Sequence, residues 1–137
     1  MKILFGYYEN IDFGLTQYSE IKFEENETKE SLEKKSKYKK YLLSAIMEDF
    51  VHINVLDDFY KDVKNLLNGE VESLTWNGNL FYHRLTKNTA TFICKDEKNT
   101  ECQEWSCPLK EYKRVLQAWK EFISLKSKPQ TQIEVEI

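Results

Sequence analysis

Hydrophobic and polar residues alternate most regularly between residues 71 and 94. Residues 71–76 and 80–85 have the β-branched and aromatic composition of strands. Asn77-Gly78 lies between them, and this dipeptide suits a type I′ turn, which needs φ > 0 at both central residues. The segment is therefore predicted to form a β-hairpin in which Leu74 faces Phe81.

A second tight turn is predicted at Lys87-Asn88, which turns the hairpin into a three-stranded meander. The pairs across this turn are then Leu85 with Ala90, His83 with Phe92 and Phe81 with Cys94. One face of the sheet collects the apolar residues Leu74, Trp76, Phe81, Leu85, Ala90, Phe92 and Cys94. A one-residue slip would turn all of them toward water, so the register is expected to be well specified.

The strongest helical pattern covers residues 109–125. Apolar residues recur there at intervals of three and four: Leu109, Tyr112, Leu116, Trp119 and Ile123, with Val115 and Phe122 beside them. Pro108 suits the first turn of such a helix. This helix is predicted to cover the apolar face of the meander.

The remaining patterns complete an α+β domain. Strands are predicted over residues 2–8, 18–23 and 101–106. A helix is expected from Thr28 to about Ile53, and a shorter one from an Asp57 cap to Asn68-Gly69. Residues 126–137 either form a flexible tail or add a last strand at 132–137. The prediction is a single α+β domain, residues 1–137, with an antiparallel β-meander sheet and helices packed mainly on one face.

Composition narrows the possible functions. The chain has 137 residues, a net charge of −3 and a pI near 5.5, whereas general nucleic-acid binders are basic. Arg84 and Arg114 are its two arginines, which disfavours phosphate and nucleotide enzymes. Residues 1–12 lack the apolar core of a signal peptide, and no stretch is long and apolar enough to span a membrane. We therefore expect a cytoplasmic protein with reduced thiols.

Two kinds of chemistry were considered for the cysteines. Cys94, Cys102 and Cys107 could bind zinc together with a histidine, but their spacing lacks the paired knuckle of structural zinc sites. A cysteine nucleophile activated by His83 has no orienting residue placed by the sequence. The sequence thus predicts no catalytic residue, no metal ligand, no cofactor and no enzymatic activity.

The most acidic segment is residues 1–27, which hold two lysines against six carboxylates and are rich in Tyr and Phe. Aromatic anchors among complementary charges are common at protein interfaces. The segment is therefore a candidate surface for a basic partner protein. Its candidate partner-binding residues are Asp12, Tyr18, Glu20, Glu24 and Glu25.

Two segments carry a resemblance to a known class. Residues 70–79 (EVESLTWNGN) read as strand-turn-strand, and residues 116–122 (LQAWKEF) lie in the closing helix. With the small acidic α+β composition, they make the chain resemble the immunity proteins of bacterial polymorphic-toxin and contact-dependent growth-inhibition systems. The resemblance implies a cytoplasmic, non-catalytic protein that binds a cognate toxin domain, often a basic nuclease, over its active site. It implies no direct contact with nucleic acid or membrane.

Two alternatives stay open. One is a small cytoplasmic enzyme whose active site is built by the fold rather than by a motif. The other is a nucleic-acid-associated or scaffold protein that uses the lysine-rich helical segment, which contains Lys34, Lys35, Lys37, Lys39 and Lys40.

Overall fold

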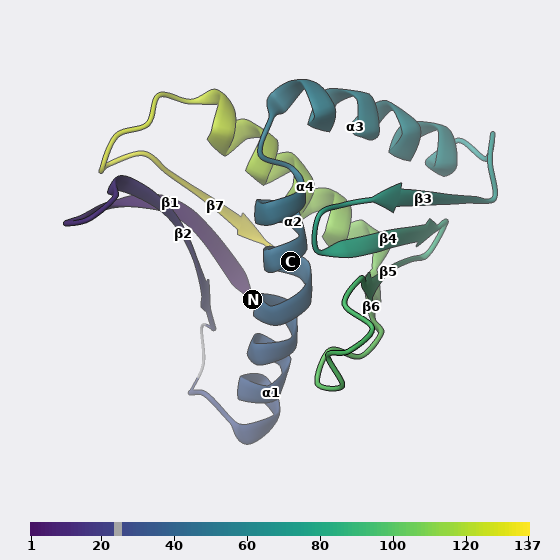
Figure 1. Ribbon diagram of the computed structural model, residues 1–137, viewed down its shortest axis with the longest axis horizontal. Coiled ribbons are helices and arrows are strands. Elements are labelled where there is room, and N and C mark those ends of the chain that lie inside the picture. Colours follow the sequence, from purple (N-terminus) through teal and green to yellow (C-terminus); the bar gives the residue numbers. More distant parts are fainter. Residues whose placement is uncertain (24–25) are drawn as a thin grey trace.

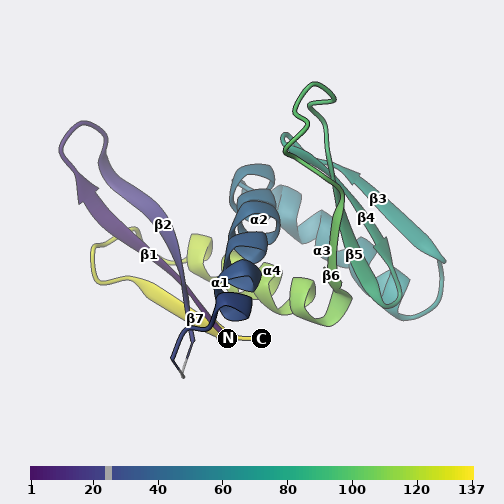
Figure 2. The same ribbon diagram turned by 90° about the horizontal axis from the view of Figure 1, so that it is seen from below.

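Two antiparallel sheets enclose a central layer of helices in the computed structural model, which describes residues 1–23 and 26–137 (Figure 1). The first sheet has the order β2 (Gly14–Lys22), β1 (Lys2–Asn10) and β7 (Gln132–Glu136). The second has the order β3 (Ser73–Asn77), β4 (Phe81–Thr86), β5 (Thr89–Cys94) and β6 (Trp105–Pro108). Figure 2 shows helices α1, α2 and α4 between the sheets. The predicted α+β class is confirmed, although the strands form two sheets rather than one.

The register of the meander is confirmed on one side and wrong on the other. Between β4 and β5, Leu85 pairs with Ala90 and Phe81 with Cys94, as predicted. Between β3 and β4, however, Leu74 pairs with Leu85 instead of Phe81. The register shift of four residues is an even number and preserves the alternation, so the predicted apolar face still points inward.

The turn after β3 explains the shift. Neither Asn77 nor Gly78 has a positive φ, so the expected type I′ turn is absent. The connection is instead organised by Asp49, whose Oδ1 accepts hydrogen bonds from the backbone N–H groups of Asn79 (2.7 Å) and Leu80 (2.9 Å). A Cβ atom on Gly78 would overlap this carboxylate. Glycine is required here by the close approach of Asp49 rather than by backbone conformation.

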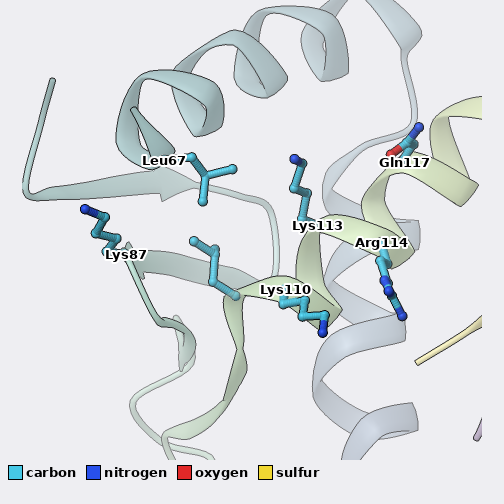
Figure 3. A pocket seen from close by; sticks show the side chains of 7 residues that line it. Leu67, Lys87, Lys110, Lys113, Arg114 and Gln117 are labelled. Atoms are coloured by element: carbon cyan, nitrogen blue, oxygen red, sulfur yellow. The ribbon is translucent and has the colours of Figure 1, made fainter. Parts of the chain in front are cut away.

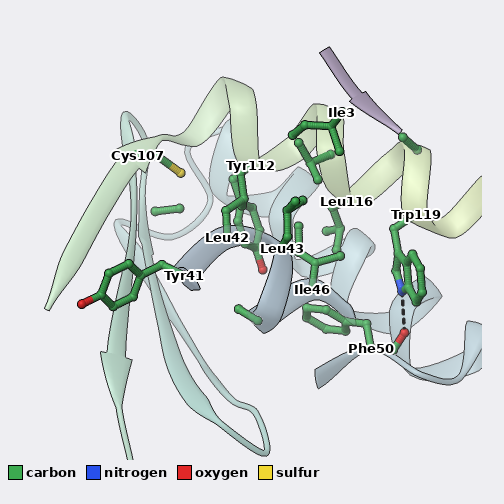
Figure 4. Packing of buried hydrophobic residues seen from close by; sticks show 14 of the residues in the cluster. Ile3, Tyr41, Leu42, Leu43, Ile46, Phe50, Cys107, Tyr112, Leu116 and Trp119 are labelled. Carbon is green, nitrogen blue, oxygen red and sulfur yellow. Dashed lines mark hydrogen bonds between the residues drawn. The ribbon is translucent and has the colours of Figure 1, made fainter. Parts of the chain in front are cut away.

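Helix α4 (Leu109–Ser124) lies at the centre of the core. Its apolar stripe is buried as predicted, and it contacts both sheets. Trp119 is fully buried; it packs edge-on against Phe5 of β1 (ring centroids 5.2 Å apart), and its Nε1 donates to the carbonyl of Phe50 (2.7 Å; Figure 4). Helix α4 was predicted to cover one sheet, but it packs against both sheets and forms part of a core that they share.

The helices between residues 28 and 67 differ from the prediction. Thr28 caps α1 (Lys29–Lys37), which continues through a π-helical segment (Tyr38–Leu43) into α2 (Ser44–Asp49). The chain leaves the helix at Phe50, whose carbonyl accepts a hydrogen bond from Trp119. Helix α3 (Ile53–Leu67) then begins four residues before the expected Asp57 cap.

The last strand joins the two ends of the chain. Of the two alternatives for residues 132–137, the structure has the strand, because β7 pairs with β1 over residues 132–136. The N–H of Ile137 donates to the carbonyl of Met1 (3.0 Å). The strand expected at residues 101–106 is shorter and begins at Trp105.

Candidate functional site

The most exposed apolar side chains of the described chain lie at the tip of the β1–β2 hairpin. Ile11 is 102% and Phe13 83% exposed, and the hairpin projects beyond the helices (Figure 2). Oδ1 of Asn10 accepts hydrogen bonds from the backbone N–H groups of Asp12 (2.9 Å) and Phe13 (3.3 Å). Gly14 follows with a φ of 71°. An Asx-type cap and a left-handed glycine thus form a three-residue loop that presents both apolar side chains to solvent.

The candidate partner-binding residues fall on this hairpin where the structure describes them. Asp12 lies in the loop between Ile11 and Phe13, whereas Tyr18 and Glu20 lie on the face of β2 that points away from the helices. Glu24 and Glu25 lie outside the described residues. The predicted site is therefore divided between the tip and the outer face of the sheet.

Tyr18 is held by its own sheet. Its ring covers Gly6 of β1, where an added Cβ would lie 2.8 Å from ring atoms. Its hydroxyl accepts a hydrogen bond from Gln132 Nε2 (3.2 Å), and its ring meets Tyr8 edge-on at 6.1 Å. Tyr18 thus stiffens the hairpin and offers only part of its ring to a partner.

Between Lys2 and Lys22 at its two ends, the hairpin carries only negative charges. Residues 3–21 contain Glu9, Asp12 and Glu20 and no Lys, Arg or His. Glu20 is paired with Lys22 at 3.5 Å on an exposed surface, a contact worth little free energy. The tip itself carries apolar side chains next to unneutralised carboxylates. The two apolar residues were missed in the sequence reasoning; the available signal was their presence in a loop otherwise built of polar residues and glycine.

A buried polar network lies on the other side of the core. His83 is fully buried; its Nε2–H donates to Asp49 Oδ2 (2.6 Å), and its Nδ1 lies 2.9 Å from the hydroxyl of Tyr112. Burial, with Cys107 and Asp49 adding to it, raises the pKa of Tyr112, so this hydroxyl keeps its proton. Each ring nitrogen of His83 therefore has a hydrogen-bond partner.

This network has the composition of an acid–base site but the connections of a structural one. A cavity of about 340 Å³ opens beside Asp49, lined also by Trp76 and Asn79. Both carboxylate oxygens of Asp49 already accept hydrogen bonds, from the backbone N–H groups of the β3–β4 turn and from His83. Asp49, His83 and Tyr112 connect α2, β4 and α4 through hydrogen bonds. This structural role accounts for their burial.

The expectation of three reduced thiols is wrong for one pair. Cys94 and Cys102 form a disulfide, with their Cα atoms 6.1 Å apart. Tight turns in the intervening loop, where Cys102 N–H donates to the Asn99 carbonyl (3.2 Å), bring the chain back to the end of β5. Cys107 is free and buried, and burial, with Glu111 contributing, raises its pKa to about 12. None of the three cysteines has the geometry of a nucleophile activated by His83.

Reducing the disulfide should destabilise the fold. Cys94 and Cys102 are eight residues apart, and closing a loop of this size is worth roughly 2–3 kcal/mol in the chain-entropy account. Urea unfolding with and without reductant should show this loss. The double variant Cys94→Ser/Cys102→Ser should not respond to reductant, whereas Cys107→Ala should respond like the wild type. Identical wild-type curves in both conditions would contradict the prediction.

The lysine-rich segment is largely engaged within the molecule. Lys34 lies over the ring of Tyr38 (5.4 Å), and Lys37 and Lys40 lie over that of Tyr41 (5.9 and 5.5 Å). The lysine stems thereby cover two buried tyrosines that close the core. These contacts give the segment a packing role and weaken the case for a nucleic-acid surface.

Other features offer little to identify the protein. Within residues 1–23 and 26–137, no three His, Cys, Asp or Glu side chains are grouped so that they could hold a metal ion. None of the described helices combines the length and hydropathy needed to cross a bilayer. Comparisons with protein-family models, curated proteins and solved structures find no match. Function must be inferred from the geometry of this molecule.

Proposed function

We propose that this protein is a non-catalytic inhibitor that binds a bacterial toxin domain through the tip and outer face of the β1–β2 hairpin. The observation that carries the proposal is the exposure of Ile11 and Phe13 at a tip whose neighbouring charges are all negative. The resemblance to immunity proteins agrees with this assignment. Large exposed apolar side chains are the usual anchors of protein interfaces.

The shape of the hairpin suits entry into a cleft. Its strands have nine residues each, and such a ribbon spans on the order of 30 Å. Ile11 and Phe13 can reach apolar positions inside a partner's groove, while Asp12 and Glu9 meet cations at its rim. A nuclease needs those cations to hold a phosphate backbone, so an acidic tip both competes with its substrate and increases the association rate.

Removing the two anchors should abolish protection. We expect Ile11→Ser/Phe13→Ser to weaken binding at least 100-fold, since the loss of two central apolar anchors typically costs several kcal/mol. The assay is growth of cells that express the toxin domain encoded next to this protein's gene, together with the affinity of the purified pair. Both side chains are solvent-exposed, so the melting temperature should not change.

A charge variant separates the electrostatic effect on the association rate from the apolar contribution to affinity. Glu9→Lys/Asp12→Lys should slow association and make the rate less sensitive to salt. The matched control is Glu70→Lys/Glu72→Lys, which makes the same charge change at exposed positions before β3. If the control loses protection and both hairpin variants retain it, the interface lies on the second sheet and the proposal is wrong.

A further inference from the structure

A basic groove lies between the end of α3, the start of α4 and the β4–β5 turn (Figure 3). Its cavity has a volume of about 340 Å³, at the lower end of the range for ligand sites. The residues that line this groove are Leu67, Lys87, Leu109, Lys110, Lys113, Arg114 and Gln117. Four of the seven are cationic and none is acidic.

These cations are not neutralised within the described chain. Lys87, Lys110 and Lys113 make no side-chain ion pair or hydrogen bond there, and Arg114 has only a long contact to a backbone carbonyl (3.4 Å). The carboxylate of Glu111, the residue after Lys110, instead accepts a hydrogen bond from the hydroxyl of Tyr38. The groove is therefore a concentrated positive surface on a protein whose net charge is negative.

The lining indicates what kind of ligand fits. Leu109 is buried and Leu67 half-buried, so the groove has an apolar component as well as a cationic rim. A free phosphate would leave the apolar part unused, and no aromatic side chain is present on which a nucleic-acid base could stack. A protein segment that carries apolar side chains next to carboxylates complements both parts.

This chain itself contains such a segment. The hairpin tip places Ile11 and Phe13 beside Asp12, with Glu9 close by in the sequence, and none of these carboxylates forms an ion pair in the described structure. Both ribbon views place the tip and the start of α4 toward opposite ends of the molecule (Figures 1 and 2). We infer that the basic groove binds the hairpin tip of a second copy of this chain.

The contact joins two different surfaces, so it is heterologous and builds head-to-tail assemblies. A single tip in a single groove buries less than a standard interface, and association should be weak, micromolar or weaker, and reduced by salt. The inference goes beyond the proposed function and does not depend on it. If both hold, a toxin domain and a second copy compete for the same tip.

The test uses two variants, each of which removes one surface. Asp12→Lys/Phe13→Ser removes the tip, and Lys110→Glu/Lys113→Glu removes the groove. By sedimentation velocity, the wild type should associate increasingly with concentration, and each variant alone should be monomeric. An equimolar mixture should form a 1:1 dimer and nothing larger, because the one intact tip meets the one intact groove.

A charge-matched control addresses non-specific effects of net charge. Lys29→Glu/Lys39→Glu makes the same change as the groove variant at exposed positions of the lysine-rich segment, and it should associate like the wild type. A wild type that stays monomeric at millimolar concentration would overturn the inference, as would a mixture of the two variants that stays monomeric. Neither result bears on toxin binding, which the growth assay measures separately.

Discussion

Replacing Asp49 with alanine should lower the free energy of unfolding by about 3–5 kcal/mol, because each buried donor left without its acceptor costs roughly 1–3 kcal/mol. The side chain of Asp49 is fully buried and receives three hydrogen bonds, from His83 and from the N–H groups of Asn79 and Leu80. Alanine leaves all three donors without their acceptor. Urea unfolding followed by tryptophan fluorescence measures the loss.

The conservative variant shows whether the cost arises from hydrogen bonding or from charge. Asp49→Asn keeps an oxygen for the two backbone donors. Its amide can donate to His83 Nε2 when the imidazole carries its proton on Nδ1 and donates it to the Tyr112 oxygen. We therefore expect it to lose clearly less stability than Asp49→Ala. Equal losses in the two variants would mean that the network does not support the fold in the way its geometry indicates.

The Asp49 carboxylate also explains why one strand register could not be predicted from this sequence. The register of β4 and β5 follows from local alternation and a tight turn, and it was predicted correctly. The register of β3 depends on Asp49, about thirty residues earlier in the chain, which replaces the turn that Asn77-Gly78 would form alone. The sequence around the turn does not show that a carboxylate from helix α2 binds its backbone N–H groups.

The helices were likewise predicted in part: the apolar stripe of α4 was expected, and the helix end before Phe50 was not. The stripe of α4 was predicted because its spacing of three and four persists over 16 residues. The break at Phe50 was not, because the apolar spacing continues across it. The chain turns there because the Phe50 carbonyl accepts a hydrogen bond from Trp119 Nε1. The Phe50 ring also stacks on that of Phe59 (centroids 5.0 Å apart). Tertiary contacts decided where the helices end.

The candidate site overlaps the segment that the sequence indicated, but its two apolar residues were not among the predicted ones. Charge counting pointed to the N-terminal segment, and Asp12 does lie at its projecting tip. The apolar residues on each side of it were assigned to an ordinary loop, since sequence alone does not say how far a hairpin projects from the body. The basic groove could not be foreseen either: its lysines come from the β4–β5 turn and from α4 and meet only in the fold.

Replacing Trp119 with alanine should destabilise the protein by about 3–5 kcal/mol, the range for truncating a large buried aromatic side chain. Trp119 is fully buried, and its ring contacts the rings of both Phe5 and Phe122. The melting temperature should fall by on the order of 10 °C or more for a domain of this size.

Trp119→Phe is the matched control, because it keeps an aromatic ring in contact with Phe5 and Phe122. It loses mainly the hydrogen bond to the Phe50 carbonyl, a net contribution of about 1 kcal/mol. Alanine should therefore be several-fold more damaging than phenylalanine, as measured by calorimetry on both variants. The reason is the position of α4, which supplies apolar surface to both sheets at once, so a cavity at Trp119 loosens the contact between β1 and the helix layer. An alanine variant that melts within a degree or two of the wild type would show that α4 does not hold the two sheets together.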